Sequence, residues 1–425
     1  MIIYRHYNIT KMVFQLKARG VLKEDEKKLR IKYARLLRKN NKDTMKIICN
    51  LFLELIYLYF DNPKRKLCKL FFPVIMANFM ELGSINSVIK EYKTKKNLYS
   101  ESYTCRILKQ LGENDSLEIS RIFRKVLFKL LKQKGFKNKG YCVAIDITAK
   151  PFYGNKNLFM VKGTKKQAGT NYSIQYLTAS IVEEGARFNL LCIPINSLTS
   201  IERKVNELIS EVRKIISIKL LFLDRWFGNK KYCHVIKALN HKFIMPMTKN
   251  RKLKEFEMSI KAQCKMKRNE SFIIELKYIF GEGRPKEYTE KVRLFAIYED
   301  KHIFYFITNI WNVSLRDCYL LADCYGYRFG IETNYRVDNI FSALTSSVVA
   351  SVRYLLMQIS LIAQDLWTFV NFLITEDKYR QPREKLKEDC SVLSIVKSRI
   401  KKLSFIWRPK ITAVQFKREM ERFLG

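Results

Sequence analysis

The sequence predicts a mixed α/β protein in which a central group of strands is flanked by helical regions. Two short apolar runs, 143–145 and 220–223, are each followed at once by an aspartate, Asp146 and Asp224. Further along, a segment with helical character carries Tyr325, Arg328 and Glu332 at spacings of three and four residues. The two apolar runs predict buried strands that each end in an acid. The segment with Tyr325, Arg328 and Glu332 predicts a helix with polar side chains on one face.

The composition favours a large folded core and a polyanionic partner. The chain has 425 residues, of which 48% are hydrophobic and 13% aromatic, which suggests two or three domains. Lys and Arg number 80 against 40 Asp and Glu, a formal net charge of +40. Such an excess favours nucleic acid first and an anionic membrane surface second. A lysine-rich bias of the whole proteome is an alternative explanation for part of it.

Cysteine usage argues against a structural zinc site. Ten cysteines are scattered singly with no Cys-x-x-Cys pair, and the chain has four histidines. Free thiols in a reducing cytosol fit this pattern, so we expect a cytoplasmic, nucleoid-associated protein without a membrane span. The apolar stretches 47–60, 70–80 and 348–374 are either short or interrupted by polar and charged residues, which is typical of core helices.

Residues 1–140 are predicted to be helical and to bind DNA. A strongly basic segment at 28–46 is either a DNA-facing helix or a solvated helix face. Helices are expected to begin near Ser84 and Ser100, in an arrangement compatible with a helix-turn-helix, and a third is expected over 116–134. The Lys- and Gly-rich stretch 135–140 marks a domain boundary.

The order of the next elements predicts which strands are neighbours. A strand over 141–146 is followed by two strands, at 172–182 and 186–195, with a tight turn between them. An amphipathic helix at 199–217 and a further strand at 220–224 come next. An antiparallel meander followed by a helical crossover places the first and last strands side by side. This is the order of a ribonuclease H-like fold, and it brings Asp146 and Asp224 to adjacent strand ends.

The predicted domains follow from this order. The core is divided into a first part at 141–240 and a completion at 315–375 that carries the Glu332 helix. Between them lies a β-rich insertion at 241–314, and a basic helical region closes the chain at 376–425. Within the insertion we expect strands at 271–280, 292–298 and 303–308.

Three carboxylates in this arrangement suit phosphodiester chemistry. Two Mg²⁺ ions roughly 3.5–4 Å apart hold the attacking and leaving oxygens in line, and Mg²⁺ prefers oxygen ligands. Asp146, Asp224 and Glu332 are the candidate ligands, with Mn²⁺ able to substitute. Each acid also has a plainer interpretation: the aspartates as turn or cap residues, and Glu332 as an ion-pair partner of Arg328. Their joint context favours the metal site.

The segment around Glu332 carries the most distinctive pattern. At about 100° per residue, Tyr325, Arg328, Glu332, Arg336 and Asn339 fall on one side of a helix. Tyrosine and arginine beside an acid suit a metal ligand flanked by phosphate contacts, because arginine can donate two hydrogen bonds to phosphate.

At these residues the chain resembles the DDE transposases of bacterial and archaeal insertion sequences. The resemblance is to the subgroup with a Tyr-x2-Arg-x3-Glu-x6-Lys signature and a β-strand insertion before the glutamate. Tyr325, Arg328 and Glu332 match that signature, whereas Asn339 stands at its lysine. The segments that begin at Asp146 and Asp224 resemble the two aspartate motifs, and the match runs from about residue 80 to 375.

The resemblance implies a cut-and-paste transposase that binds double-stranded DNA at terminal inverted repeats and at a target, usually as a homodimer. It also implies an aromatic side chain that stacks on a flipped base, for which Trp311 and Tyr278 are candidates, although core packing is favoured for Tyr278. Lys162, Lys165 and Lys166, in a Gly-containing loop after the first motif, are either phosphate contacts or solvated side chains.

Three other functions remain open at this stage. A related nuclease without strand transfer would use the same metal site. A decayed or domesticated relative would bind DNA without cutting it, which the intact acids oppose and Asn339 mildly favours. A membrane-surface protein is the most remote, because each amphipathic face is needed by the core.

Overall fold

The computed structural model describes residues 65–80, 83–114, 140–183, 186–196, 200–266, 272–280, 289–299, 302–376 and 413–424, with a few single positions elsewhere. The chain forms two compact units, Met1–Gly135 with Val337–Tyr379 and Pro409–Gly425, and Phe136–Arg336 with Arg380–Arg408. The basic segment at 28–46, the apolar stretch at 47–60 and most of the basic C-terminal region lie outside the described residues.

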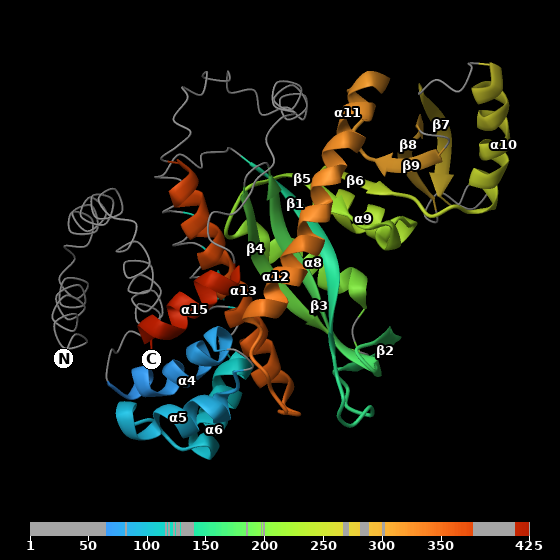
Figure 1. Ribbon diagram of the computed structural model, residues 1–425. Coiled ribbons are helices and arrows are strands. Elements are labelled where there is room, and N and C mark those ends of the chain that lie inside the picture. Colours follow the sequence, from blue (N-terminus) through green and yellow to red (C-terminus); the bar gives the residue numbers. More distant parts are fainter. Residues whose placement is uncertain are drawn as a thin grey trace. The chain divides into compact units, whose positions relative to one another are not determined.

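The second unit is built on one mixed sheet (Figure 1). The strands run in the order β2-β3-β1-β5-β6-β9-β8-β7. Off this path, β4 pairs with Gln175–Glu183 of β3. The described strands are β1 (Tyr141–Pro151), β2 (Val161–Gln167), β3 (Thr170–Glu183), β4 (Ala186–Ile195), β5 (Ile218–Leu223), β6 (Phe243–Pro246), β7 (Phe272–Phe280), β8 (Glu290–Glu299) and β9 (His302–Thr308).

The predicted meander and crossover are confirmed. β1 pairs antiparallel with β3, and β3 with β4. Helix α8 (Ile201–Arg213) then returns the chain so that β5 pairs parallel with β1, and α9 (Lys230–Ala238) does the same for β6 beside β5. The Ser200 side chain caps α8 by accepting a hydrogen bond from the Arg203 amide.

Three details differ from the sequence-based expectation. Residues 161–167 form strand β2 rather than a loop, because they pair with β3. Residues 251–266, expected within a β-rich insertion, form helix α10 (Arg251–Met266). Strands β7, β8 and β9 continue the main sheet, because β9 pairs with β6. The Asn309 side chain strengthens that junction by bonding to the Phe243 amide and the His241 carbonyl.

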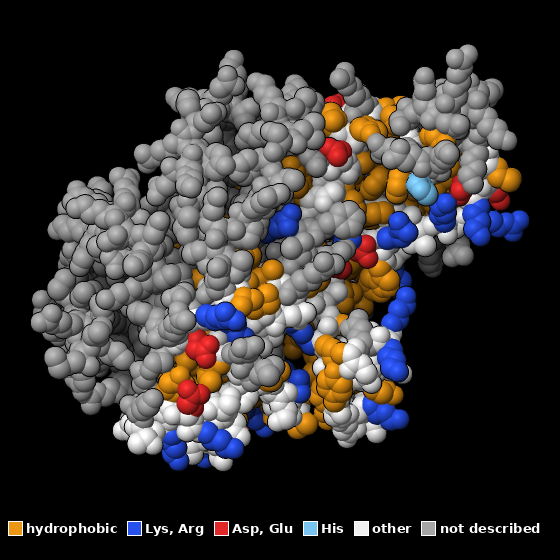
Figure 2. All heavy atoms as spheres, viewed as in Figure 1, with side chains coloured by type: hydrophobic (Ala, Val, Ile, Leu, Met, Phe, Trp, Pro, Cys, Tyr) orange, Lys and Arg blue, Asp and Glu red, His pale blue; other side chains and the backbone are white. Residues whose placement is uncertain are grey.

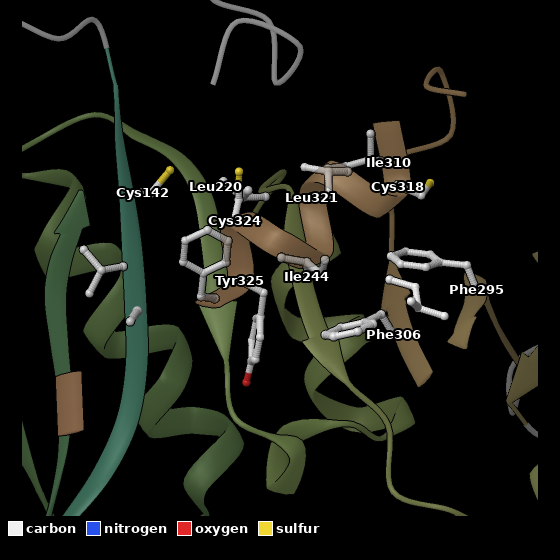
Figure 3. Close-up of a cluster of buried hydrophobic side chains, with 14 of the residues drawn as sticks. Cys142, Leu220, Ile244, Phe295, Phe306, Ile310, Cys318, Leu321, Cys324 and Tyr325 are labelled. Carbon is white, nitrogen blue, oxygen red and sulfur yellow. The ribbon is translucent and has the colours of Figure 1, made fainter. Parts of the chain in front are cut away.

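Both faces of the sheet are covered. Side chains alternate along a strand, and alternate residues of β1 and β5 enter an apolar cluster with helix α11 (Leu315–Tyr325), shown in Figure 3. The cluster includes Cys142 and Ala144 from β1, Leu220 and Phe222 from β5, and Leu321, Cys324 and Tyr325 from α11. Helix α8 packs on β3 and β4, and Figure 1 shows α8 and α9 on the face opposite α11.

The first unit is helical in its described residues. It contains α4 (Arg65–Phe79), α5 (Ile85–Lys96), α6 (Glu101–Asn114), α13 (Ala350–Glu376) and α15 (Ala413–Leu424). The predicted helix starts are confirmed: Ser84 and Ser87 form a capping box, and the Ser100 hydroxyl accepts from the Tyr103 amide. Nothing here tests the expected helix-turn-helix reader, which stays a prediction.

Helix α13 explains the polar residues in the apolar stretch 348–374. Asp365 forms an ion pair of 3.4 Å with Arg124, and both side chains are fully buried. Gln358 accepts a hydrogen bond of 2.7 Å from the Ser120 hydroxyl. These partners make α13 a core helix, and no helix within the described ranges has both the length and the apolar character to cross a bilayer.

Candidate functional site

Strand pairing places the two aspartates side by side. The parallel register of β1 and β5 pairs Ile145 with Leu223, so Asp146 and Asp224 occupy the next positions along the two chains. Because side chains alternate, Asp146 lies on the face of β1 that also presents Cys142 and Ala144 to the apolar cluster around α11. The two carboxylates therefore meet at the edge of that cluster.

One arginine joins the two carboxylates. Arg328 Nη1 lies 3.4 Å from Asp146 Oδ2, and its Nη2 lies 3.4 Å from Asp224 Oδ1. The arginine is buried and Asp146 is largely buried, while Asp224 is more accessible. The guanidinium thus lies within ion-pair distance of both carboxylates.

The interpretation of Asp224 as a cap residue is not supported. Asp224 precedes a short 3-10 turn, Arg225–Phe227, but its side chain makes no capping hydrogen bond. The Asp146 carboxylate accepts a hydrogen bond of 2.8 Å from the amide of Ile147, the next residue. This bond fixes one oxygen of Asp146, while the other faces Arg328.

Tyr325 is hydrogen-bonded to the strand that carries Asp224. Its hydroxyl donates a hydrogen bond of 3.0 Å to the Leu223 carbonyl, immediately before Asp224. The ring packs edge-on against Phe222 and Phe306, and the Arg328 guanidinium lies 5.6 Å from its centre. Burial is the main cause that raises the pKa of Tyr325 above its usual value. The phenol therefore stays neutral and continues to donate.

These contacts engage Tyr325 and Arg328 within the protein, and their predicted roles as DNA contacts stay predictions. Tyr325 is buried in the core, and Arg328 is engaged by the two carboxylates. The predicted single helix is also interrupted. Helix α11 ends at Tyr325, a 3-10 turn covers Gly326–Arg328, and α12 (Phe329–Phe341) follows. The tighter turn changes the angular position of each residue about the axis, so the simple 100° stripe does not hold through it.

The start of α12 is fixed beside Asp146. The Tyr335 and Thr178 hydroxyls are 2.6 Å apart, and Thr178 donates to the backbone carbonyl of Asp146 over 3.2 Å. Glu332 follows Arg328 by four residues and precedes Tyr335 by three, so its backbone lies between two anchors that both reach Asp146. The Glu332 and Arg336 side chains lie outside the described part of the chain.

Sequence reasoning missed Thr178 and Tyr335. Thr178 sits in β3 directly opposite Asp146 in the antiparallel register. Tyr335 follows Glu332 at a helical spacing of three residues, which was the available signal. Asn339, on the last turns of α12, is exposed.

The donors present fit a hard divalent cation in kind. Asp146 and Asp224 offer carboxylate oxygens, which Mg²⁺ prefers, and Glu332 would supply the third. Among the described side chains, no group of three His, Cys, Asp or Glu residues is placed to hold a metal ion. The Mg²⁺ pair expected from the sequence therefore remains a proposal.

The remaining predicted site residues lie away from the carboxylates. Lys162, Lys165 and Lys166 lie on β2, and burial lowers the pKa of Lys162. Trp311 follows β9; its side chain is 45% exposed and its ring centre lies 5.2 Å from Lys291 Nζ. Tyr278 is buried and accepts a hydrogen bond from Asn250, which confirms the core interpretation of this residue.

Comparison with known proteins gives a weak structural similarity and no match in sequence. No family model matches the sequence, and no curated protein matches it. Among solved structures, the chain is similar to a piggyBac transposase in a synaptic complex with hairpin DNA. The identity is 12%, the similarity covers 83% of this chain and 78% of that chain, and the TM-score is 0.42. Similarity at this level does not assign an activity to the chain.

Proposed function

We propose that the chain is a metal-dependent enzyme that cleaves and joins DNA strands, with Asp146, Asp224 and Glu332 as its catalytic carboxylates. The observation that carries the proposal is the meeting of Asp146 and Asp224 at neighbouring parallel strand ends, bridged by Arg328. The order β4-β3-β1-β5-β6 with its helical crossovers supports a ribonuclease H-like core. More specifically, we propose a cut-and-paste DDE transposase of the insertion-sequence type.

The charge pattern supports a divalent cation at this site. Asp146 and Asp224 bring carboxylate oxygens together at adjacent strand ends, beside Arg328. Mg²⁺ bound there would polarise the scissile phosphate and activate the attacking oxygen. Glu332 would complete the donor set from α12. The hydrogen bonds from Tyr335 to Thr178 and from Thr178 to the Asp146 carbonyl hold this helix beside the site.

The protein's own residues contribute positioning. Tyr325 ties the end of β5 to α11 through its bond to the Leu223 carbonyl, which limits movement of Asp224. Thr178 does the same for Asp146 from β3. A site held within a fraction of an ångström lets the carboxylates act without reorganising when substrate arrives.

Double-stranded DNA is the proposed partner, as terminal inverted repeats and as target. The formal net charge of +40 supports binding to the phosphate backbone, whose strength falls steeply with salt. A homodimer on DNA is part of the same proposal. A DNA-binding relative without catalysis is the second candidate, favoured by Asn339 at the position of the signature lysine.

The test is cleavage of a labelled duplex that carries the element's own end sequence. Wild type, Asp224→Ala and the matched control Asp323→Ala, an exposed acid on α11, would be compared in Mg²⁺, in Mn²⁺ and in EDTA. Nicking at the element boundary by wild type and Asp323→Ala, lost in Asp224→Ala and in EDTA, is the expected result. Binding without nicking by wild type in either metal would overturn catalysis and favour the second candidate.

Strand transfer is tested separately from hydrolysis. Adding a supercoiled target plasmid to the pre-cleaved end should produce joined products of higher mass. Cleavage without joined products would identify a nuclease that uses the same carboxylates.

A further inference from the structure

The segment 150–172, named here the basic hairpin, has a composition unlike that of the rest of the sheet. It carries five lysines and no acidic residue. It comprises the end of β1, the connection to β2, β2 itself and the start of β3. Figure 2 shows lysine and arginine side chains beside apolar ones where β2 lies in Figure 1. Its lysines are Lys150, Lys156, Lys162, Lys165 and Lys166.

The basic hairpin is a hydrogen-bonded structure. The Phe152 amide donates to the Tyr172 carbonyl over 2.9 Å, and the Thr170 hydroxyl donates to the Phe152 carbonyl over 2.9 Å. The turn between β2 and β3 passes through Ala168 and Gly169 at φ of 46° and 86°. Gly169 suits this turn because glycine adopts positive φ without steric cost. The hairpin therefore presents its side chains from a fixed backbone.

Two aromatic rings are displayed on this hairpin. Tyr153 is 70% exposed although its hydroxyl donates a hydrogen bond of 2.7 Å to the Ala168 carbonyl. Phe159 is 55% exposed, whereas the next residue, Met160, is buried in the core. Each ring therefore keeps more than half of its surface accessible to a ligand beside a lysine-rich strand.

The position of the hairpin relative to the carboxylates follows from β1. Lys150 lies four residues beyond Asp146 on the same strand, and Tyr153 seven residues beyond it. At about 3.3 Å per residue these separations are about 13 and 23 Å. For a duplex that runs along β1 and rises about 3.4 Å per base pair, they correspond to roughly four to seven base pairs.

We propose that the basic hairpin is a DNA-binding element beside the scissile phosphate, with Lys150 and Tyr153 roughly four to seven nucleotides from it. Lys165 and Lys166 contact phosphates, and Phe159 and Tyr153 lie against unpaired bases. The charge complementarity selects a polyanion, and the rings select one whose bases are open, because every base has a face on which an aromatic ring can stack. The proposal rests on the proposed function only for the distance from the scissile phosphate.

The experiment measures DNA binding in EDTA, so that cleavage plays no part. Fluorescence anisotropy would follow a labelled 30-base-pair duplex and a forked duplex of the same sequence across a salt series. The variants are Lys165→Ala with Lys166→Ala, Phe159→Ala, and the matched control Arg203→Ala with Arg213→Ala. The control removes the same charge from exposed positions on α8, a helix outside the basic hairpin. Circular dichroism would establish that each variant is folded.

The double-lysine variant should reduce the slope of log affinity against log salt by up to about two, because each phosphate contact contributes about 0.9. Phe159→Ala should weaken binding to the forked duplex by about tenfold and leave the paired duplex nearly unchanged. The arginine control should leave both slopes as in wild type. Permanganate footprints of open thymines should lose protection at roughly four to seven nucleotides from the cleavage position only in the hairpin variants.

Each failure has a separate meaning. If wild type binds no DNA, the proposed function and the hairpin proposal both fail. If wild type binds and the hairpin variants behave like the arginine control, the hairpin proposal alone is overturned. If the hairpin variants lose binding to phosphatidylglycerol vesicles while their DNA binding is unchanged, the hairpin contacts a membrane surface. That result would also overturn the hairpin proposal.

Discussion

Arg328 Nη1 lies 3.4 Å from the carboxylate of Asp146, in a buried position where neither group is fully solvated. The same guanidinium reaches Asp224 with its other nitrogen. Two carboxylates at adjacent strand ends repel each other when both are ionised, and the arginine offsets that repulsion. The arrangement links folding of the sheet to the charge of the candidate site.

Replacing Arg328 by alanine should destabilise the metal-free protein by about 1–3 kcal/mol. This loss is smaller than the roughly 3–5 kcal/mol of a fully buried pair because Asp224 is partly exposed. Adding Mg²⁺ should restore much of the lost stability, because a cation would then balance the carboxylates. Thermal unfolding in EDTA and in Mg²⁺ measures both effects. Arg225→Ala, which removes an exposed neighbour, is the control, and equal melting temperatures for the two variants in EDTA would contradict this account.

Glu332→Gln should abolish most cleavage while leaving folding and DNA binding intact. Loss of a ligand that stabilises transition-state charge by several kcal/mol corresponds to a rate loss of at least about 100-fold. Single-turnover nicking of the labelled duplex measures the rate, and anisotropy measures binding. Glu207→Gln on the exposed side of α8 is the matched control. A Glu332→Gln rate within threefold of the control value would remove Glu332 from the catalytic set.

Tyr325→Phe should destabilise the protein by about 1–2 kcal/mol, because the Leu223 carbonyl loses a buried donor. The apolar contacts of the ring with Phe222 and Phe306 are retained in the variant. Urea unfolding at pH 7 is the measurement. Tyr153→Phe, which removes a hydroxyl bonded near the surface, should cost less, and the reverse order would show that the Leu223 bond is unimportant.

Asp365→Asn should destabilise the helical unit by about 3–5 kcal/mol, because it leaves Arg124 charged and buried without its carboxylate. Replacing both residues together, as Arg124→Met with Asp365→Leu, should recover most of the loss. Chemical denaturation of the single and double variants tests the coupling. Additive losses in the double variant would exclude a direct interaction between the two side chains.

Stability should fall as the pH rises above about 9, where thiols of ordinary pKa begin to ionise. Burial raises the pKa of Cys318 to about 11 and that of Tyr305 to about 12. Both groups hold their protons more tightly when folded, so this contribution is complete below the unfolded pKa and is lost as the pH approaches the folded value. Urea midpoints at pH 8, 9.5 and 10.5 measure the slope. Cys318→Ala should make it shallower, and an unchanged slope would exclude a contribution from Cys318.

The sequence located the candidate acids because their local patterns are strong. An apolar run followed by an acid marks each of Asp146 and Asp224, and the spacing of strands and helices predicts the parallel pairing of β1 and β5 that the structure contains. The helix starts at Ser84 and Ser100 were equally readable, since capping is a local interaction.

The structure of residues 161–167 and 251–266 was harder to predict from the sequence, because it depends on packing and pairing with other elements. The lysine-rich strand β2 has little alternation of its own and forms because β3 is available to pair with it. Helix α10 lies in a stretch where lysines and aromatics gave no clear period. The membership of β7, β8 and β9 in the main sheet depends on the single junction of β9 with β6.

The sequence by itself determined the β1-β3-β4 meander, the helical crossover to β5 and the positions of Asp146 and Asp224, because periodicity and capping act over a few residues. Only the tertiary structure decided that Arg328 bridges those acids, that Tyr325 is a buried donor, and that Thr178 and Tyr335 secure α12 beside Asp146. The contacts of Tyr325 with Leu223, Arg328 with Asp146 and Tyr335 with Thr178 join residues 102, 182 and 157 positions apart. Such distances close only when the sheet and its covering helices have assembled, so no local pattern encodes them.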